Sequence, residues 1–142
     1  MALTLARALD CIERGCVRAR ELGFQVAVAV VDDAGHLMAC HRMDGALWVT
    51  PEIARAKANA AAAFRATTAD LEERFSAARQ LFAANVASLG DYQFVFGRGA
   101  VPLVDEGGIV GAVGVSGAVP ADNDHAIATA AAGHPAIPSP GH

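Results

Sequence analysis

Lys57 is the single lysine in a sequence of 142 residues, and both its type and its position could support chemistry. On a helix it would share an apolar face with Ile53 and Ala60, which stand at the i−4 and i+3 positions. An amine in apolar surroundings is readily neutralised, so it can act as a general base or form an imine with a carbonyl substrate. A lysine can also serve the fold, by bridging an aspartate or by extending its ammonium group to solvent. The sequence leaves both roles open.

Arg42 and Asp44 form a second candidate pair, on either side of Met43. Residues two apart in a strand share a face, so both side chains would point the same way. Arg42 could hold a carboxylate or phosphate through two parallel hydrogen bonds. With Lys57 and Asp44 as the catalytic groups, these residues predict a cofactor-independent enzyme that carries out proton transfer, isomerisation or addition–elimination on a small polar metabolite. The alternative is an internal ion pair within a simple turn.

His36 and His41 are candidate ligands or acid–base groups in the same part of the chain. They stand five residues apart, so a regular strand would send them to opposite faces. That spacing argues against a site in which both bind one metal ion, and no metal site is predicted. The sequence also lacks the motifs of a zinc protease, a Walker loop and a serine hydrolase. Each histidine is therefore an axial ligand, an acid–base group or a surface residue.

Gly114, Ser116 and Asp124 are candidate ligand contacts in the C-terminal part of the chain. Gly114 interrupts a strand of small apolar residues, and such a glycine needs either close packing or a close ligand as its reason. The backbone N–H groups that follow Ser116 lead into a helix, whose start favours an anion. Asp124 lies in the first turn of that helix.

Two Asp/Gly turns, at residues 32–35 and 105–108, indicate one β-hairpin in each half of the chain. The hairpins flank a helical middle, which predicts an α+β fold with one antiparallel sheet of about five strands and helices on its faces. Pro102 indicates that its strand is either an edge strand or an irregular entry to the sheet. We expect strands at residues 25–31, 36–42, 92–96, 101–104 and 109–115. The first expected helix ends at Gly23, and further helices are expected at 50–66, 75–87 and 122–132. A short helix is also expected after 50–66, capped by Thr67 or Thr68.

The overall composition excludes several classes of protein. A net charge of −4 without a basic stripe argues against nucleic-acid binding, which needs clustered positive charge. The chain has no apolar run of about 18 residues, so no membrane span is predicted. Its three cysteines form no C-x-x-C pair, which argues against a disulfide framework or a zinc ribbon. We expect a cytoplasmic protein with a single domain at residues 1–133, followed by a Pro-rich and poorly ordered tail at 134–142.

Several motifs together carry a family resemblance. They are VVD at residues 30–32, GHL at 35–37, RMDGA at 42–46, KA at 57–58, VPL at 101–103 and GAVGVSG at 111–117. With these motifs, the chain resembles the GlcG/HbpS family of heme-binding-protein-like domains, which also form the C-terminal part of PduO-type proteins. The resemblance covers nearly the whole chain, from residue 3 to residue 132.

The resemblance implies a profilin-like fold, a homo-oligomer, and a pocket between the sheet and the helices. It also implies a small-molecule ligand, with heme or a corrinoid-related molecule as candidates. The first predicted helix has no histidine, where some heme-binding relatives carry the axial ligand, so His36 or His41 would take that role. We therefore predict a small-molecule-binding protein. The alternatives are the enzyme based on Lys57, Arg42 and Asp44, and a purely structural subunit.

Overall fold

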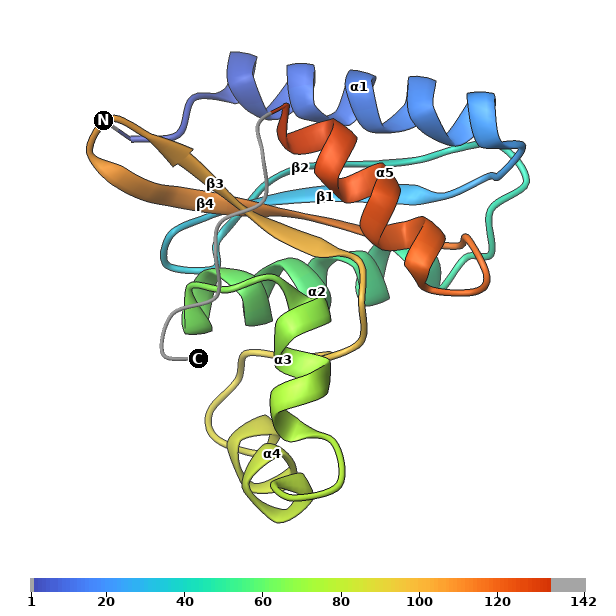
Figure 1. Cartoon of the computed structure of the whole chain (residues 1–142). Helices are drawn as coiled ribbons and strands as arrows, with labels where there is room; N and C mark the ends of the chain where they lie inside the picture. Colours follow the sequence, from blue (N-terminus) through green and yellow to red (C-terminus); the bar gives the residue numbers. More distant parts are fainter. Residues whose placement is uncertain (1, 134–142) are drawn as a thin grey trace.

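The computed structural model describes residues 2–133, so the predicted tail at 134–142 lies outside the described residues. In chain order the elements are α1 (Leu5–Leu22), β1 (Ala27–Asp32), β2 (Leu37–Arg42), α2 (Thr50–Phe64), α3 (Thr68–Phe75), α4 (Gln80–Ala87), β3 (Ala100–Asp105), β4 (Gly108–Ser116) and α5 (Asp122–Ala132). The four strands form one antiparallel sheet in the order β2-β1-β4-β3. Helices α1 and α5 cover one face of this sheet, and α2 covers the other (Figure 1). None of the helices within residues 2–133 is both long and apolar enough to cross a membrane.

Both predicted hairpins form, and they meet in the centre of the sheet. Strand β1 pairs with β4 in antiparallel register, so the N-terminal and C-terminal hairpins share one layer. In the first turn, Asp32 Oδ1 accepts hydrogen bonds from the backbone N–H groups of Ala34 and His36, both at 2.9 Å. Gly35 supplies the positive φ of 84° in this turn. The predictions of an α+β fold and of a single antiparallel sheet are therefore confirmed.

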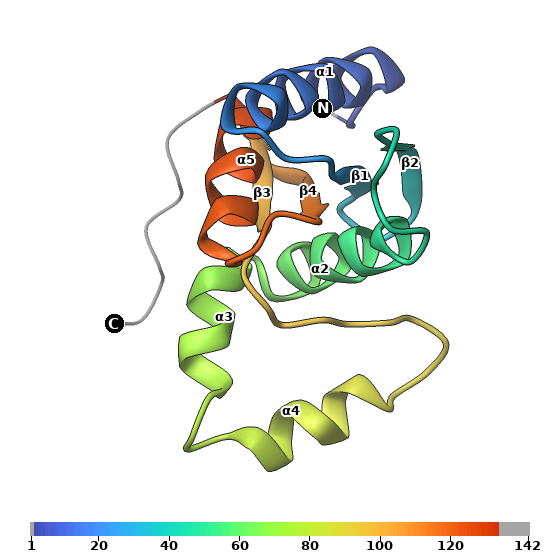
Figure 2. The same cartoon turned by 90° about the vertical axis from the view of Figure 1, so that its right-hand side faces the viewer.

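The predicted fifth strand, residues 92–96, does not form, so the expected number of strands was wrong. This segment runs along the outer face of α2, on the side away from the sheet (Figure 2). No strand edge is within reach of its backbone there, and Val95 N–H instead donates to Ala56 O of the helix at 3.3 Å. Its aromatic side chains Phe94 and Phe96 pack edge-on against Phe64. We refer to residues 91–96 as the strap.

Helix α2 packs closely on the sheet because both surfaces carry small residues. Ala58 and Ala61 of the helix form a buried cluster with Ala112 of β4. A Cβ atom on Gly114 would lie only 2.1 Å from Ala54 O, so no larger residue fits under the helix. The helix therefore occupies the space that a ligand of Gly114 would need.

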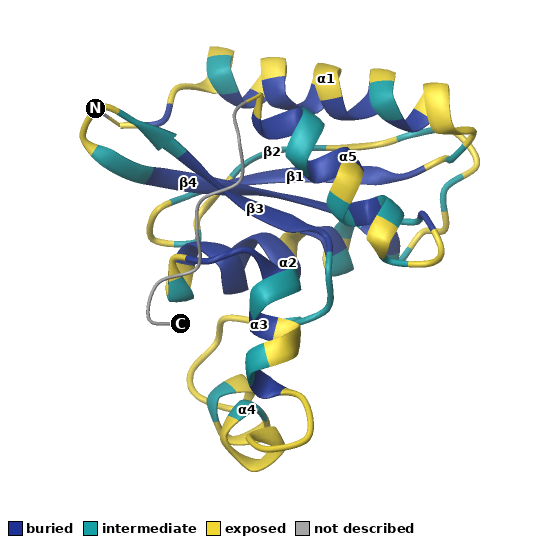
Figure 3. Cartoon of the chain, in the orientation of Figure 1, coloured by how far each residue is buried: buried dark blue, intermediate teal, exposed yellow. Residues whose placement is uncertain are grey.

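Helices α3 and α4 extend from the body of the molecule as an arm (Figures 1 and 3). Thr67 caps α3, as predicted, by accepting a hydrogen bond from a backbone N–H at 3.1 Å. Phe75 packs edge-on against Phe64 and anchors the arm to α2. The predicted helix over residues 75–87 is shorter than expected, because Ser76 ends α3 and α4 begins only at Gln80. Helix α4 has no buried residue and is exposed over most of its length.

Candidate functional site

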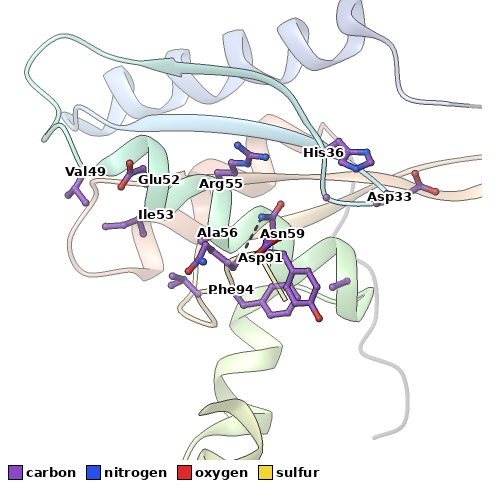
Figure 4. Close-up of a pocket in the computed structure, with 16 residues that line it drawn as sticks. Asp33, His36, Val49, Glu52, Ile53, Arg55, Ala56, Asn59, Asp91 and Phe94 are labelled. Atoms are coloured by element: carbon purple, nitrogen blue, oxygen red, sulfur yellow. Dashed lines mark hydrogen bonds between the residues drawn. The ribbon is translucent and has the colours of Figure 1, made fainter. Parts of the chain in front are cut away.

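A pocket of about 1100 Å³ lies between the outer face of α2, the β1–β2 turn and the strap (Figure 4). Asp33 and His36 stand at one end of the pocket, and Val49, Glu52 and Ile53 stand at the other. The remaining lining residues are Ala34, Gly35, Arg55, Ala56, Asn59, Ala63, Asp91, Tyr92, Gln93, Phe94 and Val95.

One face of α2 forms the floor of the pocket. Ile53, Ala56, Asn59 and Ala63 recur at three- and four-residue intervals, so they share the helix face that points away from the sheet. The alanines leave room above the helix, and the strap closes the opposite side. Rings of the strap's Tyr92 and Phe94 lie with their centroids 4.9 Å apart, which gives the wall a continuous aromatic surface. The pocket thus combines an apolar and aromatic floor and wall with a polar margin that carries several charged side chains.

Asn59 is the polar group most deeply set in this pocket, with 8% of its surface exposed. Its Nδ2 donates a hydrogen bond to Gln93 O at 3.4 Å, which joins α2 to the strap. Its Oδ1 is buried and accepts no hydrogen bond in the described part of the chain. That oxygen faces the β1–β2 turn, since a Cβ atom on Gly35 would lie 3.4 Å from it. The pocket therefore contains a buried acceptor that the protein does not satisfy.

Charged groups surround the pocket without neutralising one another. Arg55 is exposed, and no hydrogen bond or ion pair ties down its guanidinium group among residues 2–133. His36 has its side chain 81% exposed, with Nδ1 at 3.5 Å from Asp32 Oδ2. The carboxylates of Glu52 and Asp91 lie on the rim. A cation, an imidazole and carboxylates are thus available to a molecule in the pocket.

A second, more open pocket of about 640 Å³ lies between α1 and β2. It brings together His41, Arg42 and Asp44, although β2 ends at Arg42 and Asp44 lies in the following turn. Cys16 and Cys40 also line it. Burial raises the pKa of both thiols, so they remain protonated and weakly nucleophilic at neutral pH.

Lys57 lies in neither of these two pockets. Its Nζ is buried and donates hydrogen bonds to Asp124 Oδ2 at 3.2 Å and to Val115 O at 3.1 Å. Asp124 Oδ1 in turn accepts a hydrogen bond from Ala118 N–H at 2.9 Å. Burial raises the pKa of the Asp124 carboxyl, and the attraction of Lys57 and the Ala118 hydrogen bond offset part of that rise. The pair thus connects α2, the end of β4 and the start of α5.

The predicted site residues are therefore distributed over separate places in the fold. Lys57 meets Asp124 in the interior, where Gly114 and Ser116 are also buried. Of the predicted residues, the first pocket contains His36, and the second contains His41, Arg42 and Asp44. The structure does not bring Lys57 to Arg42 and Asp44 in one pocket, which the predicted enzyme site requires.

A family comparison agrees with this architecture. The sequence profile of a family described as "Haem degrading protein HbpS-like" matches residues 3–133. The chain belongs to the HbpS-like family. The resemblance inferred from the sequence motifs is therefore confirmed.

Several relatives align with this HbpS-like chain over most of their length. Protein GlcG of Escherichia coli (strain K12) is 39% identical over 116 residues, which are 80% of this chain and 81% of GlcG. The crystal structure of a double mutant of HbpS from Streptomyces reticuli aligns with a TM-score of 0.82 at 30% identity, over 94% of this chain and 86% of the mutant. A complex of PduOC with heme aligns with a TM-score of 0.83 at 27% identity, over 94% of each chain.

Sequence reasoning missed most of the first pocket of this HbpS-like domain. Arg55 and Asn59 were not singled out, although both lie on the α2 stretch that contains Lys57. The pattern that could have indicated them is the four-residue spacing of these two polar residues among alanines, but the same pattern is typical of a solvent-exposed helix face. The strap was interpreted as a strand, so its contribution to a pocket was not foreseen.

Proposed function

We propose that this HbpS-like protein binds a small molecule in the first pocket and that heme is one such ligand. The heme complex of the PduOC relative, which shares the fold over 94% of this chain, is the observation that carries the proposal. The family description, which names haem degradation, also supports heme as a ligand.

The residues of the first pocket fit a heme group. Tyr92 and Phe94 offer an aromatic surface for the porphyrin ring, and Ile53 and Ala56 offer apolar contact. Arg55 has no partner among the described residues and would hold a propionate carboxylate. His36 offers an imidazole nitrogen as the axial ligand. Bound heme would supply the redox and ligand-binding chemistry of its iron, while the chain binds and orients the ring.

Of the two histidines predicted as axial ligands, His36 has the better surroundings. It stands at the end of the larger pocket, beside apolar and aromatic walls (Figure 4). His41 shares the smaller pocket with Arg20 and Arg42, and that pocket has no aromatic wall. A flat apolar ring would therefore bury more of its surface next to His36.

A hemin titration tests this proposal. Purified protein should shift the Soret band of hemin, and His36→Ala should abolish that shift and weaken binding by about tenfold or more, because the axial ligand is lost. His41→Ala is the matched control and should leave both the spectrum and the affinity unchanged. A wild-type protein that does not shift the Soret band would contradict the proposal. A shift that depends on His41 and not on His36 would move the ligand to the second pocket.

The cofactor-independent enzyme has less support. Its proposed base, Lys57, is held between Asp124 and Val115 O and is only 5% exposed, so a substrate would have to displace a buried ion pair to reach it. Arg42 stays available in the second pocket to bind an anion, with the carboxylate of Asp44 beside it. We therefore give them a ligand-binding role in the proposal and give Lys57 none.

We further propose that the protein acts as a homo-oligomer, as the sequence resemblance implied. Large apolar side chains stand exposed at two places, the loop before α2 and the arm. Trp48 in the loop and Leu81 in the arm are each 76% exposed, and Leu47 and Phe82 beside them are exposed as well. Groups of exposed apolar side chains often mark contacts with a partner. The cytoplasmic location stays a prediction from the sequence.

A further inference from the structure

The side-chain oxygen of Asn59 is a polar group in the first pocket that the fold does not use. It is buried, it makes no hydrogen bond among residues 2–133, and it faces the turn that carries Gly35. Exchanging the oxygen and nitrogen of the amide would not remove the problem. The amide oxygen would then oppose Gln93 O, which now accepts the hydrogen bond from Nδ2 at 3.4 Å. The orientation of Asn59 is therefore fixed by the strap, and its acceptor is left for another molecule.

An unpaired acceptor in a pocket wall selects among ligands. A ligand that places an apolar surface beside such an oxygen leaves it buried without a partner. A ligand that places an N–H or O–H donor there satisfies the acceptor with a hydrogen bond, and this favours its binding. Discrimination by a buried hydrogen-bonding group is generally stronger than discrimination by apolar fit.

The neighbouring groups narrow the chemistry of that ligand. Arg55, one turn before Asn59 on the same helix, offers a cation for a carboxylate, and Tyr92 and Phe94 offer an aromatic surface. The matching molecule is flat, carries carboxylates, and has a hydrogen-bond donor on the flat part. Heme meets the first two conditions but not the third, because its ring nitrogens all bind iron. A ring-opened tetrapyrrole meets all three, because it keeps the propionates and has free pyrrole and lactam N–H groups.

We propose that Asn59 is a specificity-determining residue and that its Oδ1 accepts a hydrogen bond from an N–H group of a ring-opened tetrapyrrole. This inference rests on the proposed function, since it places a tetrapyrrole in the same pocket. It adds that the pocket favours the opened, metal-free form over heme. Arg55 serves both forms through their propionates. His36 would bind only the iron of heme, whereas Asn59 Oδ1 would bind only an N–H group of the opened form.

Biliverdin and hemin are suitable probes, because they carry the same propionates and differ in free N–H groups. Affinities of both are measured by quenching of the protein's fluorescence. Asn59→Leu, which removes the acceptor, should weaken biliverdin binding by about tenfold and change hemin binding by less than about twofold. Asn59→Asp keeps an acceptor at the position but turns a second oxygen toward Gln93 O, so we expect a biliverdin affinity between those of the wild type and Asn59→Leu. Asn123→Leu, on α5 at the opposite face of the sheet, is the control and should change neither affinity.

The outcomes separate this inference from the proposed function. If Asn59→Leu weakens both probes equally, Asn59 only supports the pocket through Gln93, and the inference is overturned. It is also overturned if biliverdin binding does not change in that variant. Selective loss of biliverdin binding by a protein that does not bind hemin would support the inference and refute the heme proposal. A wild-type protein that binds neither probe would overturn both, and unchanged thermal unfolding of the variants shows that the fold is intact.

Discussion

At the scale of single residues, Lys57 and Asp124 show how burial decides the role of a charged side chain. Both side chains are almost completely buried, with 6% and 5% of their surfaces exposed. A Cβ atom on Gly99 would lie 2.9 Å from Lys57 Nζ, so the chain closes tightly around the ammonium group. A buried ion pair with further hydrogen bonds to the backbone fixes the elements that carry it, although its net contribution to stability is small.

Removing one partner of this pair should be strongly destabilising. Lys57→Met leaves the Asp124 carboxylate buried without its cation, and we expect the free energy of unfolding to fall by about 3–5 kcal/mol. Adding Asp124→Leu to Lys57→Met should restore part of that loss, because no charge then remains buried. Urea-induced unfolding measures both effects. Asp122→Asn, at a residue whose ion pair with Arg98 is exposed, is the control and should cost about 1 kcal/mol or less.

Unchanged stability of Lys57→Met would make Lys57 a catalytic candidate again. If Lys57→Met unfolds like the wild type, the ammonium group is not needed by the fold. Its burial next to Asp124 would then require a functional reason.

At the scale of elements, the contact of α2 with β4 sets the geometry of the first pocket. The sheet face of α2 is fixed by small residues, and its opposite face then presents Asn59 and Ile53 to the strap. Gly114 controls this contact, since a Cβ atom there would also lie 2.9 Å from Ala58 N. Any movement of α2 away from the sheet would narrow the pocket on its other side.

Gly114→Ala should therefore affect both stability and binding. We expect a loss of about 3 kcal/mol in the free energy of unfolding, because the new methyl group overlaps helix backbone that cannot yield locally. Hemin binding should weaken in the same variant, because α2 has to shift toward the strap. Gly97→Ala is the matched control, since a Cβ atom there would meet only Val95 Cγ1 at 3.9 Å. Normal stability of Gly114→Ala in urea would show that the helix is not held as closely as described.

At the scale of the whole molecule, apolar side chains are exposed in two regions. One is an end of the molecule where the loops around Gly45 and Gly117 both approach Gln25, and Trp48 and Val119 are exposed nearby. The other is the arm, where Leu81, Phe82 and Leu89 are exposed. Isolated apolar residues are common on protein surfaces, but groups of large ones usually mark contacts between molecules.

The solution mass of the protein tests the proposed homo-oligomer. Light scattering coupled to size-exclusion chromatography should give a multiple of the 14.5 kDa chain mass. Trp48→Asp and Leu81→Asp should each lower the measured mass, because a charge at the centre of an apolar interface opposes association. Glu106→Asp, in the exposed turn between β3 and β4, should leave the mass unchanged. A wild-type mass of 14.5 kDa at all concentrations would rule out the oligomer.

The parts of the fold that were predictable are those decided by local chemistry. The turn at Gly35, the cap at Thr67 and the end of α1 at Gly23 depend on neighbours within a few residues, and all three form as expected. The family was also predictable, because its motifs are short and contiguous. The strap was not, because an apolar aromatic segment becomes a strand only if another strand edge is available, and α2 separates this one from the sheet.

The chain's own sequence thus determined its hairpins, most of its helices and its family, since each of these rests on residues close together along the chain. Only the tertiary structure decided what the polar side chains do. Lys57 acquires its role from Asp124, which is 67 residues away, and Asn59 acquires its own from Gln93, which is 34 residues away. Whether a charged or polar group is buried, paired or left without a partner depends on elements that come into contact only when the chain folds. Local sequence patterns do not determine those contacts.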